Sequence, residues 1–163
     1  MHRVFFFGGL VCLAFSTLVL AQESGEKVLV NKAATVKFEK STSRPDCATR
    51  AVERGDPSKG PAVLLNKFTP GCSVPWHWHT ANGTIMITSG TVRFEMRGEK
   101  PVLTRRGDYV FMPGHHVHQE TCLGSVPCLL FIHTDGILDI HYVDKADKEI
   151  PLEQALKANS GRP

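Results

Sequence analysis

The fold is decided by residues 71–98, which read GCSVPWHWHTANGTIMITSGTVRFEMRG. Short runs at 74–79, 84–88 and 91–97 are separated here by turns rich in Gly, Asn and Ser. The run 91–97 alternates cleanly, with Val92, Phe94 and Met96 on one face and charged residues on the other. Because successive side chains of a β-strand point to opposite faces, this stretch predicts three short strands joined by tight turns.

The same pattern of short strands extends in both directions. Further strands are expected at 48–54, 62–68, 102–104, 109–112, 117–122, 128–133 and 137–143, with one or two edge strands over 28–39. About ten short strands bounded by turn residues predict an all-β sandwich or barrel. A single helix is expected over 152–159, after Pro151. The prediction is one barrel domain, with its main part at about 60–143, and a short C-terminal helix.

Residues 1–21 have the composition of a secretory signal peptide. Arg3 gives a short basic start, residues 4–20 are almost wholly apolar, and Val19-Leu-Ala21 supplies small residues at the cleavage positions. A membrane anchor is the alternative, but the apolar run is slightly short and no basic stop follows it. We therefore expect cleavage after residue 21, a single domain over 22–163 and an exported protein, periplasmic or secreted, with no membrane contact after cleavage.

Charge and cysteine content narrow the class of protein further. The chain has 19 Lys and Arg against 16 Asp and Glu, without a basic cluster, which argues against nucleic acid as a partner. Hydrophobic residues make up 42% and charged residues 21%, as in globular proteins. Cys122 and Cys128 flank a predicted hairpin loop, and in an oxidising compartment they form either a disulfide or two buried thiols.

Three histidines predict a metal site. His77 and His79 are two residues apart, so on a strand both imidazoles point to one face. His118, which follows the Pro/Gly turn at 113–114, is the best candidate for a third ligand. Three neutral imidazoles with open positions suit one divalent transition metal, such as iron, zinc, manganese or nickel. Closing the sheet into a barrel would place them in an enclosed pocket.

These residues resemble the two sequence motifs of the cupin superfamily. The positions that match are Gly71, His77, His79, Gly90, Gly107, Pro113 and His118. The flanking residues are similar to a subgroup of exported single-domain cupins related to the cupin half of the anti-sigma factor ChrR. The resemblance implies a jelly-roll β-barrel with the three histidines as metal ligands.

The chain departs from the motif at its acidic ligand. The motif glutamate falls on Gly83, and the last motif residue, usually Asn, falls on Cys122. A divalent ion held by imidazoles alone keeps its charge in a low-dielectric interior, so we expect the natural ligand to be a small chelating anion. Glu120, on the same strand face as His118, and Asn82 are the candidates for a replacement ligand.

The resemblance leaves two functions open. One is a metal-dependent oxidoreductase with dioxygenase-like chemistry, for which Glu120, His133 and Tyr109 are catalytic candidates by residue type. The other is a non-catalytic, sensor-like module that binds zinc or a small ligand. Whether the protein is an enzyme is therefore not decided by the sequence. Trp76 and Trp78 alternate with the ligands and point to the opposite face, where they would pack against another sheet or a partner in a homodimer.

Overall fold

The computed structural model describes residues 27–160, so the predicted signal peptide at 1–21 lies outside the described residues. By internal contacts the chain divides into Met1–Val30 and Asn31–Pro163, and the fold described here is that of the second unit. Between residues 27 and 160, no helix combines the length and the hydrophobicity that a membrane span requires.

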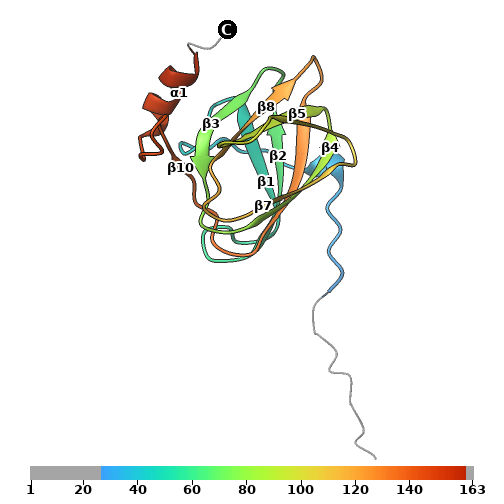
Figure 1. The fold of residues 1–163 in the computed structure, drawn as a ribbon. Coiled ribbons are helices and arrows are strands. Elements are labelled where there is room, and N and C mark those ends of the chain that lie inside the picture. Colours follow the sequence, from blue (N-terminus) through green and yellow to red (C-terminus); the bar gives the residue numbers. More distant parts are fainter. Residues whose placement is uncertain (1–26, 161–163) are drawn as a thin grey trace, which may run out of the picture. The chain divides into compact units, whose positions relative to one another are not determined.

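Two antiparallel five-stranded sheets form the barrel (Figure 1). The first sheet has the order β1 (Ala48–Gly55), β2 (Ala62–Phe68), β9 (Cys128–Thr134), β4 (Gly83–Ser89) and β7 (Tyr109–Met112). The second has the order β10 (His141–Tyr142), β3 (Ser73–Trp78), β8 (His118–Leu123), β5 (Thr91–Met96) and β6 (Val102–Arg105). Strands distant in sequence are neighbours in both sheets, as in a jelly roll. The all-β jelly-roll prediction is confirmed.

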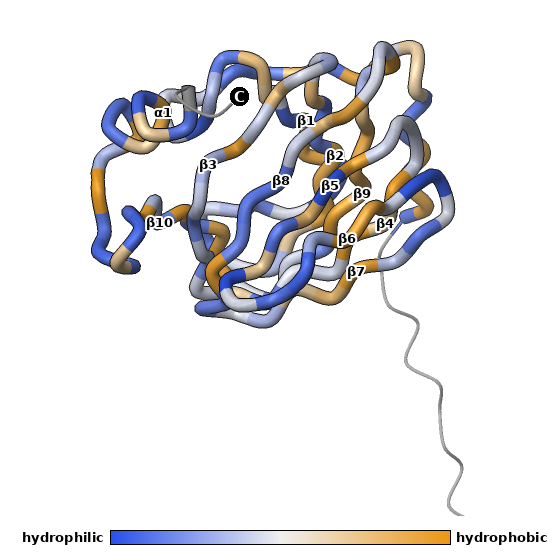
Figure 2. The backbone as a smooth tube through the Cα atoms, turned by 45° about the horizontal axis from the view of Figure 1, so that its top comes forward, coloured by the Kyte–Doolittle hydropathy of each residue, from blue (hydrophilic) through white to orange (hydrophobic). Residues whose placement is uncertain are grey.

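The core lies between the two sheets. Alternate residues of β2, β4, β5 and β9 point inward, and Leu64, Phe68, Ile87, Val92, Phe94 and Leu130 are almost completely buried. Figure 2 shows much of β2, β4 and β9 as hydrophobic, whereas β8 is mainly hydrophilic. A buried strand of polar residues is unusual in a core, and it marks where the site lies.

Two predicted segments differ from the structure. Residues 28–39 contain no strand: a 3-10 turn, η1 (Ala33–Thr35), occupies the middle, and Glu39 makes an isolated bridge to Arg50. Of the apolar side chains that suggested a strand, Val28 and Val30 are exposed, while Val36 and Phe38 are half-buried. A strand needs a neighbour along its length, and the segment pairs with β1 at one residue. The last predicted strand shortens to His141–Tyr142, and the helix α1 (Leu152–Ser160) begins where it was expected.

Two disulfides join segments at the ends of the strands. Cys122–Cys128 closes the β8–β9 hairpin, which confirms the first of the two sequence alternatives. Cys47–Cys72 was not predicted; it connects the residue before β1 to the residue before β3, with Cα atoms 5.6 Å apart. This second pair is 25 residues apart in sequence, and only the packing of the two sheets brings its members together.

Gly90 makes the turn between β4 and β5 possible. Its φ of +78° belongs to the left-handed region, which L side chains adopt only under strain. A Cβ atom at this position would lie 2.9 Å from Cα of Cys128, closer than packing permits. The motif glycine is therefore required by both conformation and space.

The outward faces of Trp76 and Trp78 are covered within the chain. The indole of Trp78 stacks on the His141 ring at 3.9 Å between centroids, and His115 lies 4.7 Å away on a tilted plane. The guanidinium of Arg97 lies 4.3 Å from the centroid of Trp76. Helix α1 contacts β3 and lies outside the barrel beside it (Figure 1).

Candidate metal centre

The three predicted histidines meet at one point of the barrel interior. His77 on β3 pairs directly with His118 on β8, and His79 follows the end of β3. The ring centroids lie 4.3 Å apart for His77 and His118, 4.8 Å for His77 and His79, and 5.5 Å for His79 and His118. One nitrogen from each ring lies within 4.8 Å of the others. A small rearrangement would bring all three to bonding distance of a single ion.

Backbone carbonyl groups fix the orientation and tautomer of each imidazole. Nδ1 of His77 is 2.6 Å from the Pro75 carbonyl oxygen, and Nδ1 of His118 is 2.8 Å from that of His116. Nδ1 of His79 is 2.5 Å from the carbonyl oxygen of Asp139. Because a carbonyl only accepts, each Nδ1 carries the hydrogen and donates it. Nε2 of every ring is therefore left with a lone pair for a metal.

Burial keeps these rings neutral. Desolvation lowers the pKa of His118 to about 3 and lowers the pKa values of His77 and His79 as well, with mutual repulsion adding to the effect at His77. A metal ion requires the unprotonated imidazole. The free protein therefore already holds the ligands in the state that binds metal.

The local sequence explains how β3 and its continuation present two ligands. Pro75 has no N–H, and the pairing of β3 with β8 shifts register between Val74 and His77. This bulge brings the Pro75 carbonyl to the ring of His77. Beyond β3, the backbone N–H and the hydroxyl of Thr80 both donate to the carboxylate of Asp139, which positions the Asp139 carbonyl against His79.

Glu120 places a carboxylate beside the three imidazoles. Its Oε2 atom lies 3.8 Å from Nε2 of His77 and 3.9 Å from Nε2 of His118, on the face of β8 that also carries His118. The residue is 8% exposed, and Oε2 has no hydrogen-bond partner within residues 27–160. Burial raises the pKa of this carboxyl to about 8, partly offset by the positive charge of Arg50. Of the two sequence candidates for a replacement ligand, Glu120 and Asn82, only Glu120 lines the cavity with the imidazoles.

Arg44 and Arg50 also line the cavity, and sequence reasoning missed both. The cavity has a volume of about 50 Å³, room for roughly three to five water molecules. Nε of Arg50 donates to Oδ1 of Asn66 at 2.8 Å, and Asn66 occupies an inward position of β2 between Leu64 and Phe68. A polar residue at a core position of an otherwise apolar strand was the signal that could have revealed this side of the site.

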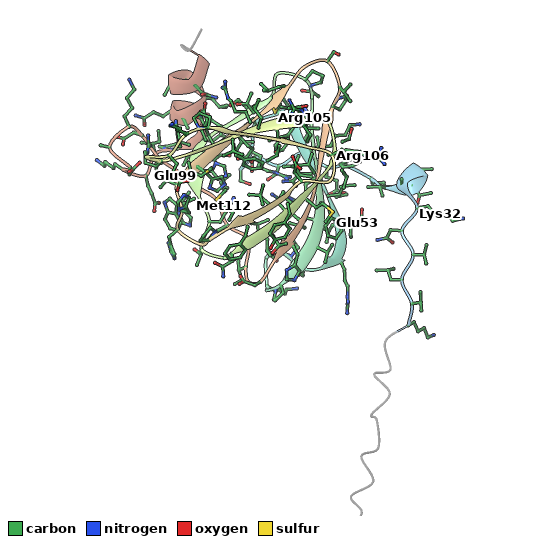
Figure 3. All side chains as sticks on the ribbon, turned by 45° about the vertical axis from the view of Figure 1, so that its right-hand side comes forward. Lys32, Glu53, Glu99, Arg105, Arg106 and Met112 are labelled. Atoms are coloured by element: carbon green, nitrogen blue, oxygen red, sulfur yellow. A yellow bond between two sulfur atoms is a disulfide. The ribbon has the colours of Figure 1, made fainter. Side chains whose placement is uncertain are left out.

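The remaining sequence candidates lie elsewhere. Asn82 is engaged in holding loops together: its Nδ2 donates to Asp135 and its Oδ1 accepts from the Gly114 N–H. His133, a catalytic candidate by residue type, is exposed on the outer face of β9 and does not line the cavity. Tyr109 is 60% exposed and does not line the cavity. Met112, at the other end of β7, lines the cavity and is labelled in Figure 3.

Gly83, where the motif has glutamate, lines the same cavity. A Cβ atom built on it would meet Cβ of Met112 at 3.9 Å, an ordinary contact. The usual ligand position is thus available in space but carries no side chain, and the carboxylate that lies in the cavity is that of Glu120 on β8.

Comparisons with known proteins agree with this fold. A family model described as a cupin domain matches residues 64–144, which include all three histidines and Glu120. The chain therefore belongs to the cupin superfamily. A search of curated proteins gave no match to the chain.

Solved structures show the same fold at low sequence identity. The polyketide cyclase RemF from Streptomyces resistomycificus has a TM-score of 0.66 and 13% identity, covering 84% of this chain and 95% of that one. The DMSP lyase DddQ from Ruegeria pomeroyi has a TM-score of 0.57 and 21% identity, covering 77% and 75%. A cupin-like protein from Thermotoga maritima has a TM-score of 0.57 and 18% identity, covering 78% and 96%. At these identities the likeness supports the fold and not a particular activity.

Proposed function

We propose that this protein is an exported metal-dependent cupin that binds one divalent transition metal and acts on a small, chelating anionic molecule. Nε2 of His77, His79 and His118 would hold the ion, and Glu120 would supply the acidic ligand that position 83 lacks. The observation that carries the proposal is the set of three Nδ1–H···O=C hydrogen bonds, which direct three unprotonated nitrogens to one point.

The charges of the donor set suit such an ion. A dication brought into a low-dielectric cavity needs compensation, and a buried carboxylate without a partner is costly in the metal-free protein. The carboxylate would compensate part of the charge of the ion, and the ion would give the buried carboxylate a partner. One negative charge from Glu120 leaves a positive excess, which favours an anion as the further ligand.

We propose dioxygenase-like chemistry as the activity. A redox-active metal such as iron would supply the oxidation chemistry, while the protein binds and orients the substrate and excludes water. The apolar walls, including Phe94, Ile85 and Met112, limit the space that is left for water. Two of the relatives in structure are described as a lyase and a cyclase, so the cupin fold itself does not select the reaction.

Export is supported by two independent features. Residues 1–21 read as a signal peptide, and two disulfides lie among the described residues. Disulfides of this kind persist in the periplasm or outside the cell and are rare in the cytosol. Cell fractionation, with amino-terminal sequencing of the mature protein, tests the predicted cleavage after residue 21.

Metal content of the purified protein tests the central claim. The protein should be produced without a histidine tag and assayed by mass spectrometry for bound metals. The alanine variants of His77, His79 and His118 should each lose the ion, and Glu120→Gln should bind it more weakly. His133→Ala is the matched control, because this histidine is exposed on the outer face. Full metal occupancy in the three ligand variants would refute the site.

Turnover distinguishes the enzyme from the binding module. Oxygen uptake by the iron-loaded protein with a β-diketone or thiol substrate supports the dioxygenase-like activity. Tightly held zinc with no turnover on any substrate favours a non-catalytic module. The predicted homodimer is tested by light scattering; the tryptophans first considered for it are covered within the chain, and the exposed apolar side chains Met86, Tyr109, Phe111 and Phe131 lie on the other sheet.

A further inference from the structure

A second cavity adjoins the metal cavity. This outer recess has a volume of about 270 Å³ and is lined by Ser43, Arg44, Arg50, Leu138, Asp139 and Ile140. Four of these residues, namely Arg44, Arg50, Leu138 and Ile140, also line the metal cavity. The two arginines therefore stand at the boundary between the recess and the three histidines.

Arg44 is a buried cation without a partner for much of its guanidinium. The residue is 9% exposed, and its Nε and Nη1 atoms are buried with no hydrogen-bond partner among the described residues. Each unsatisfied buried donor of this kind costs free energy. Donors that stay unpaired in the free protein are expected where a ligand completes them.

Arg50 adds a second positive charge at the same place. Its Nε donates to the neutral amide of Asn66, and within residues 27–160 neither Arg44 nor Arg50 forms an ion pair. Burial, followed by repulsion from Arg44, lowers the pKa of Arg50 to about 9. A buried cation, Arg44, beside a half-buried one, Arg50, with no ion pair to either in the described part of the chain is unfavourable, and a bound anion would relieve both.

Asp139, the acidic residue of the recess, does not neutralise Arg44 or Arg50. Both carboxylate oxygens of Asp139 accept hydrogen bonds from Thr80, and Oδ2 also lies 3.1 Å from Nε2 of His141. Glu120 lies close enough to Arg50 for each charge to influence the pKa of the other, but it forms no ion pair with either arginine in the described residues. The recess therefore presents positive charge, above all that of the unpaired Arg44 guanidinium, toward an incoming molecule.

We propose that Arg44 and Arg50 form a carboxylate-binding subsite at the entrance of the metal cavity. The planar fork of a guanidinium matches a carboxylate with two parallel hydrogen bonds. The metal cavity holds only a few non-hydrogen atoms, so the carboxylate stays at the arginines while a second oxygen or sulfur donor of the same molecule reaches the ion. The substrate class is a small organic acid with a second donor group, such as a dicarboxylate or an oxo acid.

The carboxylate subsite rests on the proposed metal site only for the contact between the second donor group and the ion. The subsite and the metal site are therefore tested separately. Isothermal titration calorimetry would compare succinate, 2-oxoglutarate, acetate, dimethyl succinate and inorganic phosphate as ligands. Each is titrated into the metal-loaded and the metal-free full-length mature protein. The acids should bind both forms, with succinate and 2-oxoglutarate binding more tightly when metal is present, and the neutral ester should not bind.

Variants of the arginines separate the subsite from the metal. Arg44→Gln and Arg50→Gln should each weaken succinate binding about ten- to hundredfold, as expected for a lost charge-assisted hydrogen bond, and leave metal content unchanged. Arg44→Lys should keep part of the affinity. Arg106→Gln, at an exposed arginine labelled in Figure 3, should have no effect. Thermal unfolding guards against misfolding: losing the unpaired Arg44 guanidinium should not lower stability, whereas Arg50→Gln also loses the hydrogen bond to Asn66.

Three results would overturn the subsite. They are unchanged succinate affinity in both glutamine variants, equal binding of the neutral ester, and tighter binding of phosphate than of any carboxylate. If the metal-free protein binds the acids through the arginines but never takes up metal, the subsite stands and the proposed metal function fails. If metal binds with full stoichiometry and the arginine variants behave as the parent, the subsite alone fails.

Discussion

Replacing Glu120 by glutamine should stabilise the metal-free protein at alkaline pH. Burial raises the pKa of this carboxyl from 4.5 to about 8. Since each tenfold change in acidity corresponds to about 1.4 kcal/mol, ionising Glu120 inside the metal-free barrel costs about 5 kcal/mol. Glutamine is neutral at every pH and nearly the same size, so the variant avoids this cost. Such a difference is comparable with the whole stability of many domains.

The sign of the pH dependence follows from the direction of the shift. The folded state binds the proton more tightly than the unfolded state, so the contribution to stability is present below pH 4.5 and is lost as the pH rises to about 8. The stability advantage of Glu120→Gln should therefore be near zero at acid pH and grow through neutrality to its full size above about pH 8. Saturating metal should reduce or reverse it, because the ion stabilises the carboxylate.

Urea unfolding of the metal-free proteins between about pH 5 and pH 9 provides the assay, without reductant so that both disulfides remain intact. Glu39→Gln, at an exposed carboxylate, is the matched control and should show no pH-dependent difference from the parent. A Glu120→Gln advantage that stays constant over this range would show that the carboxylate is solvated, and the reasoning about a buried acid beside the imidazoles would be refuted.

Three further predictions concern the metal site and the scaffold. Adding Gly83→Glu to the Glu120→Gln variant should restore its metal affinity, because position 83 faces the cavity and has space for a side chain. Metal titration measures the affinity, and an unchanged value would contradict this geometry. Replacing Cys47 and Cys72 by alanine should cost about 3.5 kcal/mol in denaturant unfolding, against about 2 kcal/mol for the pair that closes the shorter loop. The metal-free protein should lose stability as the pH falls below 6.5, because burial depresses the pKa of His118 to about 3, and His118→Gln should reduce that slope.

The strand pattern and the three ligands were predictable because both depend on local spacing. The alternation within 91–97 predicts a strand whatever its partners are, and an i, i+2 pair of histidines shares a face on any strand. His118 could be named only as the best candidate for the third ligand, and the family resemblance supported that choice, since nothing local connects β8 to β3. The strand predicted over 28–39 failed for the complementary reason: its apolar residues have the right composition, but the fold offers no neighbour along their length.

Closure of the barrel decided what local patterns could not. The distance from Glu120 to the imidazoles depends on the bulge at Pro75 and on the register between β3 and β8, which no spacing rule specifies. Arg44 and Arg50, at the boundary of the cavity, lie just before β1 and on it, in a part of the chain outside both sequence motifs. They reach the cavity because β1 pairs with β2 and lies near the segment around residue 139. Sequence by itself determined which side chains could bind a metal and on which strands they lie. Tertiary packing decided which charges face that metal, because electrostatic energy depends on separations through space and not along the chain.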